Sequence, residues 1–176
     1  MTIFIAGIHG VGKTDLAKPA AARLAMTYAT ASQLIQDERG RASWSMSKVV
    51  DEVAENQAAL VAAVSRVKAT GHSLLLDGHC VLRTAANLHE CLPKAVFRDL
   101  ACSAVVLVGC STKVILSRLA DRGDNSWTEA EVDAFGLAEA DHAAAICASL
   151  AMPLISLDAP TPDEFDAVLA RLSISR

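Results

Sequence analysis

The sequence predicts an α/β protein: a three-layer, doubly wound parallel sheet of about five strands, covered by helices on both faces. Two observations predict this fold. Short runs of continuous apolar residues, typical of buried parallel strands, are followed by turns and then by helical spacing. The composition agrees, because 52% of the residues are hydrophobic but only 4% are aromatic. With 176 residues and no linker rich in Pro, Gly and Ser, residues 1–176 should form a single domain.

The first predicted strand and helix flank a glycine-rich turn. Residues 2–6 (Thr-Ile-Phe-Ile-Ala) form an apolar run that ends at Gly7, which predicts a buried strand. After Gly12 the spacing becomes helical, with apolar residues three or four positions apart at Leu16, Ala20, Ala21 and Leu24. Pro19 lies inside this helix and removes one backbone hydrogen bond, so we expect a kink there.

Apolar runs predict further strands at residues 73–76, 104–108 and 154–157. Between the first two strands of the chain, residues 47–70 carry valine and leucine on one stripe, which predicts a long amphipathic helix. Gly71 stands where a left-handed cap would end that helix.

Two later helices have recognisable start signals. Thr128 and Glu131 have the spacing of a capping box, in which each residue bonds the backbone of the other, so a helix should occupy residues 128–150. Thr161 and Glu164 have the same spacing at the start of the closing helix.

Charge and cysteine content disfavour several classes of protein. The net charge of -4 and the pI near 5.7 provide no basic field for nucleic acid, so no nucleic-acid partner is expected. Five cysteines without a C-x-x-C pair indicate reduced thiols rather than a disulfide framework. Since no apolar run approaches the ~18 residues of a membrane span, we expect a cytoplasmic protein without a membrane partner.

Residues 7–14 match the pattern G-x-x-x-x-G-K-[ST] of phosphate-binding loops. Such a loop aims backbone N–H groups inward, and the following helix adds positive charge at its N-terminus. We therefore predict an ATP site formed by Gly7, His9, Gly10, Val11, Gly12, Lys13 and Thr14. Lys13 would bridge the β- and γ-phosphates, and the Thr14 hydroxyl would bind Mg²⁺. The alternatives are a plain glycine turn with an exposed lysine, and a His9 side chain that points to water.

Asp77 ends the apolar run at residues 73–76, at the sheet edge where parallel α/β proteins bind ligands. In P-loop enzymes such an aspartate holds magnesium through water, so Thr14 and Asp77 are the predicted metal ligands. His79 should line the same pocket. The alternative is that Asp77 serves as a turn residue before Gly78.

With these motifs the chain resembles the nucleoside monophosphate kinases, adenylate kinase in particular. The resemblance rests on the phosphate loop and on Leu75-Leu76-Asp77-Gly78 followed by Arg83-Thr84. The latter looks like the family's strand, Asp-Gly and substrate-side Arg-Thr, although the spacing to Arg83 is longer. The resemblance implies that Arg83 grips the phosphate of the acceptor.

A third similarity concerns the arginines that close over the phosphates in this family. Arg118 and Arg122 are separated by four positions, so one helix face would present both guanidinium groups. Residues 122–128 would then be a short lid. The alternative is a solvated helix end, where basic residues are favoured by the helix dipole.

The resemblance also places an acceptor-side insertion at residues 31–70, whose Arg39 and Arg41 would join Arg83 and His79 in contacting the substrate.

The predicted function is transfer of the γ-phosphoryl group of ATP to a small acceptor, with a nucleoside monophosphate preferred. Lys13, Asp77, Arg118 and Arg122 would be catalytic, acting mainly through electrostatic stabilisation. One alternative is a small-molecule kinase with a hydroxyl acceptor, whose proton Asp77 could take. Another is an ATP-dependent switch or ATPase subunit that acts on a protein partner.

Overall fold

A computed structural model describes residues 1–40 and 52–174. Its main sheet contains five strands, β1 (Thr2–Ala6), β2 (Thr27–Thr30), β3 (Leu74–Asp77), β6 (Cys102–Gly109) and β7 (Leu154–Asp158). A separate hairpin is formed by β4 (Val81–Ala85) and β5 (Leu88–Cys91). The helices are α1 (Lys13–Arg23), α2 (Ala31–Arg39), α3 (Val53–Ala69), α4 (Lys94–Asp99), α5 (Thr112–Asp121), α6 (Glu129–Leu150) and α7 (Pro162–Ile174).

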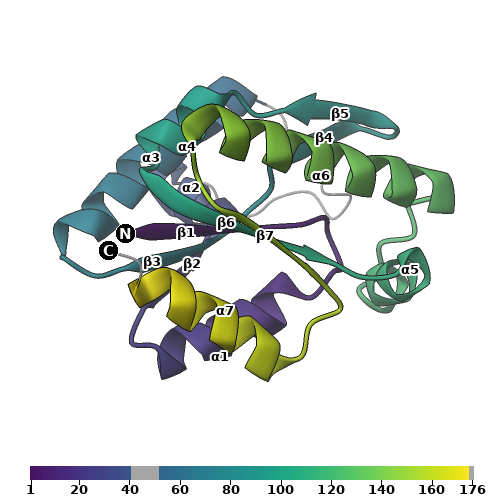
Figure 1. Cartoon of the computed structure of the whole chain (residues 1–176). Coiled ribbons are helices and arrows are strands. Elements are labelled where there is room, and N and C mark those ends of the chain that lie inside the picture. The colour runs from purple at the N-terminus through teal and green to yellow at the C-terminus, as the bar shows by residue number, and fades with distance from the viewer. Residues whose placement is uncertain (41–51, 175–176) are drawn as a thin grey trace.

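The main sheet is parallel, with the strand order β2-β3-β1-β6-β7 (Figure 1). This arrangement confirms the predicted α/β fold and the predicted number of strands. In the central strand, Ile5 pairs with Asp77 on one side and with Val106 on the other. Because β1 and β3 are parallel neighbours, the loop after β1 and the turn after β3 meet at one edge of the sheet.

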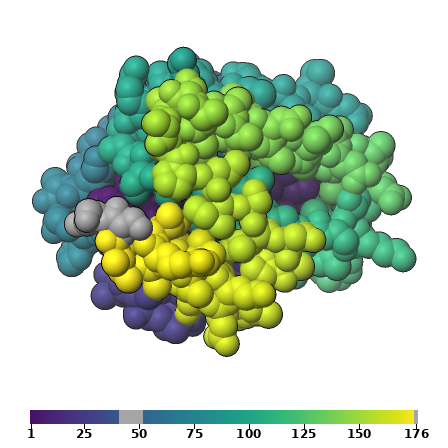
Figure 2. All heavy atoms as spheres, in the orientation of Figure 1, coloured from purple at the N-terminus to yellow at the C-terminus, as the bar shows by residue number. Residues whose placement is uncertain are grey.

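Side chains of β1 alternate between two cores, one on each face of the sheet. Ile3 and Ile5 pack in the core that includes α1 and α7, whereas Phe4 and Ala6 pack in the core that includes α3, α4 and part of α6. Figure 1 shows these helices on opposite sides of the sheet, and Figure 2 shows α7 lying beside the purple residues of the N-terminal region. The predicted three-layer arrangement is therefore correct.

Two elements were not predicted from apolar runs. Strand β2 is a short edge strand whose residues are all half-buried, so it carries no continuous apolar signal. The hairpin of β4 and β5 contains buried Val81 and Arg83 but an exposed second strand, and it lies against α6 rather than in the sheet. Its polar residues gave no strand pattern.

The helix signals are largely confirmed. Gly71 has a φ of 81°, as a left-handed cap requires, directly after the cap residue of α3. Helix α3 begins at Val53, and the predicted start near residue 47 lies outside the described residues. Helix α1 continues past Pro19 to Arg23, and the kink at Pro19 stays a prediction.

The two capping boxes differ. At α7 the box is complete, because the Thr161 hydroxyl accepts from the Glu164 N–H and the Glu164 carboxylate accepts from the Thr161 N–H. At α6 the Thr128 hydroxyl accepts from the Glu131 N–H at 3.1 Å, but the Glu131 carboxylate bonds Arg83 instead. The predicted box at Thr128 is therefore only half formed.

Within the described part of the chain, no helix is both long enough and apolar enough to cross a membrane.

Gly78 is required by close packing at the end of β3. A Cβ atom there would lie 2.7 Å from the ring of Phe4, which is buried and packs edge-on against Phe97. We expect Gly78→Ala to lower the free energy of unfolding by about 1–3 kcal/mol, because the core would be overpacked. Urea denaturation measures this change.

Gly136 provides a control of opposite sign. It lies in α6, and the nearest atom to an added Cβ is 4.0 Å away. Gly136→Ala should raise the free energy of unfolding by about 0.5–1 kcal/mol through helix propensity. Equal effects of the two substitutions would contradict the packing argument.

Candidate functional site

The phosphate loop joins the end of β1 to the start of α1. Gly7 has a φ of 138°, and a Cβ atom at this position would lie 2.4 Å from the carbonyl oxygen of Val108. Only glycine fits so close to a neighbouring strand in this conformation. Lys13 is the first residue of α1, so the N-terminus of this helix directly follows the loop, as in anion-binding sites of this kind.

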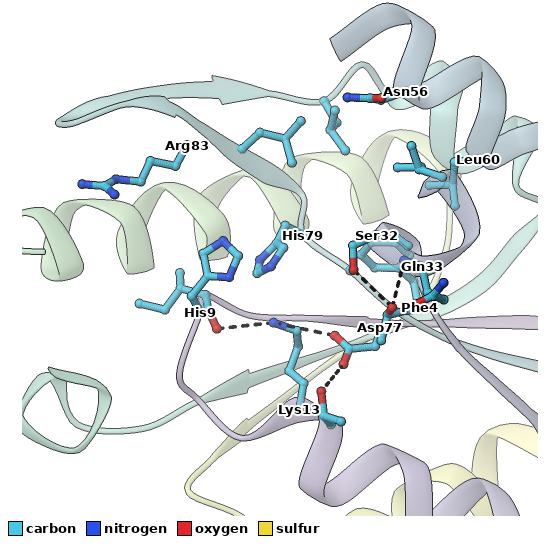
Figure 3. A pocket seen from close by; sticks show the side chains of 18 of the residues that line it. Phe4, His9, Lys13, Ser32, Gln33, Asn56, Leu60, Asp77, His79 and Arg83 are labelled. Atoms are coloured by element: carbon cyan, nitrogen blue, oxygen red, sulfur yellow. Dashed lines mark hydrogen bonds and ion pairs between the residues drawn. The ribbon is translucent and has the colours of Figure 1, made fainter. Parts of the chain in front are cut away.

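The side chain of Lys13 is held by hydrogen bonds to the backbone of the phosphate loop. Its side chain is only 7% exposed, and Nζ donates to the carbonyl oxygens of Gly7 at 2.5 Å and Ile8 at 3.3 Å. Nζ also lies 3.8 Å from the Asp77 carboxylate (Figure 3). Burial lowers the pKa of Lys13, against the opposing charges of Asp77 and Glu139. The lysine is buried and paired, so the exposed-lysine alternative does not apply.

Asp77 faces the first turn of α1. Its Oδ2 accepts a hydrogen bond from the Thr14 hydroxyl at 2.9 Å and another from the Tyr28 hydroxyl at 3.0 Å. Tyr28 was missed by the sequence analysis, because β2 gave no signal there. The structure thus brings together Thr14 and Asp77, the two residues predicted to hold magnesium. Hydroxyl and carboxylate oxygens are hard ligands that suit Mg²⁺.

Glu139 of α6 is a buried carboxylate that connects the phosphate loop to the turn after β3. It accepts hydrogen bonds from the backbone N–H groups of Gly7 at 3.0 Å, Cys80 at 2.9 Å and Val81 at 2.7 Å. Its exposed fraction is 1%. Burial raises the pKa of Glu139, although these N–H donors and the charge of Lys13 oppose the shift.

Sequence reasoning missed Glu139, although a signal was present. The buried positions of α6 include Val132, Phe135, Ala143 and Ile146, and position 139 falls on the same stripe at helical spacing. An acidic residue on an apolar stripe must find hydrogen-bond partners inside the protein. The pattern could have marked Glu139 as unusual, but not the N–H groups that it binds.

Arg83, predicted to grip the acceptor phosphate, makes an extensive set of contacts within the protein. Its guanidinium forms two hydrogen bonds with the Glu131 carboxylate, at 2.7 and 2.9 Å, and donates to the Ser126 hydroxyl at 2.9 Å. It also stacks over the Trp127 ring at 4.0 Å. Arg83 is 1% exposed, yet it lines the cavity that opens beside the phosphate loop.

The partner carboxylate of Arg83 is stabilised as the charged form. Burial by itself opposes ionisation of Glu131, but hydrogen bonds from Arg83 and from the Asn87 N–H lower its pKa overall.

The two predicted lid arginines occupy different positions. Arg118 Nη1 donates to the carbonyl oxygens of Gly10 at 3.0 Å and Val11 at 2.8 Å, so it supports the backbone of the phosphate loop. Arg122 is exposed and lines the cavity.

The segment between α5 and α6, predicted as a lid, is folded around Asp124, whose carboxylate accepts from Ser126 and Trp127. Closure of this segment over phosphates stays a prediction.

The two histidines of the predicted site lie together at the mouth of the loop. The rings of His9 and His79 have centroids 4.1 Å apart, and both line the cavity (Figure 3). Arg39 of α2 instead contacts Asn56 and Glu52. Arg41 lies outside the described residues.

A cavity of about 460 Å³ extends from the phosphate loop to the space between α2, α3 and α4. Lys13, Thr14 and Asp77 line one end, and apolar and amide side chains line the other. The volume suits a small molecule, and the charged groups are concentrated where phosphates would bind.

A glycine loop between a central parallel strand and a helix, with a buried lysine and a facing aspartate, defines the class of P-loop nucleotide-binding proteins. Residues 6–133 match the AAA domain family, and the chain belongs to that family. A comparison with curated proteins found no match.

Solved structures share the fold at low sequence identity. A shikimate kinase from Acinetobacter baumannii is 13% identical, with a TM-score of 0.62 over 99% of this chain and 93% of that one. A gluconokinase from Sinorhizobium meliloti is also 13% identical, with a TM-score of 0.53 over 97% and 92% of the two chains. An uncharacterized protein from Eubacterium ventriosum is 12% identical, with a TM-score of 0.55 over 100% and 99%.

Glu139→Gln should loosen the phosphate loop. The substitution places an NH₂ group against backbone donors, so we expect the free energy of unfolding to fall by about 2–3 kcal/mol. Binding of a nonhydrolysable ATP analogue, measured by titration calorimetry, should weaken as well. Asp141→Asn, the same chemical change at an exposed position of α6, is the control and should change neither quantity.

Arg83→Leu should destabilise the fold by about 3–5 kcal/mol, because Glu131 would stay buried without its partner. The double variant Arg83→Leu, Glu131→Leu should recover most of the loss.

The folded-state pKa of Glu131 is lowered, so its stabilisation exists above the unfolded pKa and disappears as the pH falls through the folded pKa. The stability advantage of the wild type over the double variant should therefore shrink below about pH 4 in urea titrations. Unchanged stability of the single variant would show that the pair contributes little.

Proposed function

We propose that this protein is an ATP-dependent phosphotransferase whose acceptor is a small molecule with a hydroxyl group. The observation that carries the proposal is the cavity that begins at Lys13 and Asp77 and continues between α2, α3 and α4. Shikimate kinase and gluconokinase, two fold neighbours, are named for small hydroxyl compounds, which supports the same class of acceptor. Because both proteins are only 13% identical to this chain, they support the proposal through their shared fold alone.

The arginine contacts favour a hydroxyl acceptor over a nucleoside monophosphate. An acceptor phosphate needs a cation beside it, and Arg83 was predicted for this role, with Arg39 and Arg41 as further substrate contacts. In the structure Arg83 is bound to Glu131 and Ser126, and Arg39 is bound to Asn56 and Glu52. Moving the Arg83 guanidinium to an acceptor would leave the buried Glu131 carboxylate without its partner.

In the proposed reaction the acceptor oxygen forms a bond to the γ-phosphorus of ATP. The bond from that phosphorus to the β–γ bridging oxygen breaks, and ADP leaves with the electron pair. Asp77 takes the proton of the acceptor hydroxyl, as the carboxylate nearest to Lys13 in the cavity. Lys13 and the N-terminus of α1 neutralise charge on the phosphoryl oxygens, and the loop fixes the phosphates in line.

Thr14 would hold magnesium through its hydroxyl and Asp77 through a water molecule, which leaves the Asp77 carboxylate able to take the acceptor proton. When bound, Mg²⁺ supplies positive charge beside the β- and γ-phosphates. Arg122, exposed at the rim of the cavity, is the remaining candidate for contact with the phosphates.

The test is ADP formation from Mg-ATP with a panel of sugars, polyols, nucleosides and nucleoside monophosphates. We expect at least one hydroxyl compound to stimulate turnover and to yield a phosphomonoester. Lys13→Ala should reduce the stimulated rate by ~100-fold or more, because the lysine contacts transition-state charge. Stimulation by a protein alone would favour an ATP-dependent switch, and stimulation by monophosphates alone would restore the nucleoside monophosphate kinase interpretation.

A further inference from the structure

The end of the cavity away from the phosphate loop is uncharged among the described residues. All cavity-lining residues that come from α2, α3 and α4 are neutral, and the walls include Phe4, Leu60, Leu82, Val96, Phe97 and Leu100. Figure 3 shows Leu60 and Asn56 reaching this region from α3, across the cavity from Lys13. Among the described residues, the lining side chains of these helices offer a carboxylate or phosphate only neutral donors, a hydroxyl and amides, and no cation to offset the lost hydration.

Gln57 is the polar group that this region leaves unmatched. Gln57 is only 8% exposed and lines the cavity. The buried Oε1 atom of its side chain has no hydrogen-bond partner within the described parts of the chain. The adjacent Asn56 is different, because its Oδ1 accepts from Arg39 at 2.5 Å. A desolvated carbonyl oxygen without a donor is unfavourable, and a ligand N–H or O–H would satisfy it.

Gln57 occupies a position of α3 where the helical pattern favours an apolar residue. Val53, Leu60, Val64 and Val67 lie on one stripe of α3, and position 57 falls between the first two at helical spacing. An apolar residue at this position would fill the stripe without leaving an unmatched amide. The amide therefore serves recognition better than it serves packing.

We propose that the acceptor is an uncharged hydroxyl compound with an apolar, ring-sized body that donates a hydrogen bond to Gln57 Oε1. Its body would lie between α3 and α4, and its reacting hydroxyl would lie towards Lys13 and Asp77. An unmodified nucleoside is an uncharged hydroxyl compound with an aromatic ring of this size, whereas shikimate, gluconate and nucleoside monophosphates carry anionic groups. This inference rests on the proposed phosphotransferase function and narrows its substrate.

The first experiment compares acceptors in the ADP-release assay with the full-length protein. Adenosine, guanosine, cytidine and uridine are compared with their 5′-monophosphates, shikimate and gluconate. We expect a nucleoside to stimulate turnover and the anionic compounds to be inactive. Preferential phosphorylation of shikimate or gluconate would leave the proposed function intact and overturn the neutral acceptor, whereas preferential phosphorylation of a monophosphate would overturn both.

A binding measurement separates failure of the inference from failure of the function. If no compound stimulates turnover, the four nucleosides are titrated into protein saturated with a nonhydrolysable ATP analogue. Saturable binding of a nucleoside would support the recognition site although the transferase proposal had failed. Absence of binding by all four nucleosides and by the neutral sugars and polyols of the acceptor panel would overturn the inference.

Gln57→Leu tests the role of the amide directly. We expect the KM for the neutral acceptor to rise about tenfold, while the KM for ATP stays unchanged, because one buried hydrogen bond to the acceptor is lost. The melting temperature should stay equal or rise, since an apolar side chain of similar size replaces an unmatched amide. Glu55→Ala, at an exposed position of the same helix, is the control.

A purely structural role for Gln57 would produce the opposite pattern. The melting temperature of Gln57→Leu would then fall, and the ratio of the two KM values would stay at its wild-type level. If Gln57→Leu does not fold, Gln57→Asn, which shortens the amide by one methylene, replaces it in the same assay. An unchanged acceptor KM in a folded variant would overturn the proposal.

Discussion

The rest of the site depends on the hydrogen bonds that the Glu139 carboxylate accepts from the backbone. They join Gly7, the first residue of the phosphate loop, to Cys80 and Val81, which follow the turn after β3. A loop that must aim its N–H groups at phosphates cannot also satisfy all of them within regular secondary structure. Glu139 binds one of these groups and fixes the loop against the segment that carries Asp77.

Helix α6 contributes two buried acidic residues with separate tasks. Glu139 holds the phosphate loop, and Glu131 holds the β4–β5 hairpin through Arg83 and the Asn87 N–H. Each carboxylate is buried with several donors, which offsets the cost of removing its charge from water. The helix therefore acts as a common support for both sides of the cavity.

Charged side chains of the cavity lie at the phosphate loop, whereas the lining residues from α2, α3 and α4 are neutral. Lys13, Asp77 and the N-terminus of α1 lie where phosphoryl transfer would develop charge. The helices at the other end supply apolar surface and amides, which bind an uncharged body by shape and by a few directed hydrogen bonds. The motif at residues 7–14 located the phosphate loop, which the structure has between β1 and α1. In the structure Arg83 is hydrogen-bonded to Glu131. Contact between Arg83 and an acceptor phosphate, which the resemblance to adenylate kinase implied, stays a prediction.

The sequence alone determined the features that depend on neighbouring residues. The strand–loop–helix unit at residues 2–23, the Thr161 and Glu164 box, and the left-handed cap at Gly71 follow from local spacing and backbone preference. Only the tertiary structure decided which distant groups meet. Glu131 had a local role available at Thr128, but the guanidinium of Arg83 offers a stronger, charge-assisted bond. Glu139 finds Gly7 from far along the chain, and no local pattern encodes that contact, because it exists only once the sheet and α6 have packed.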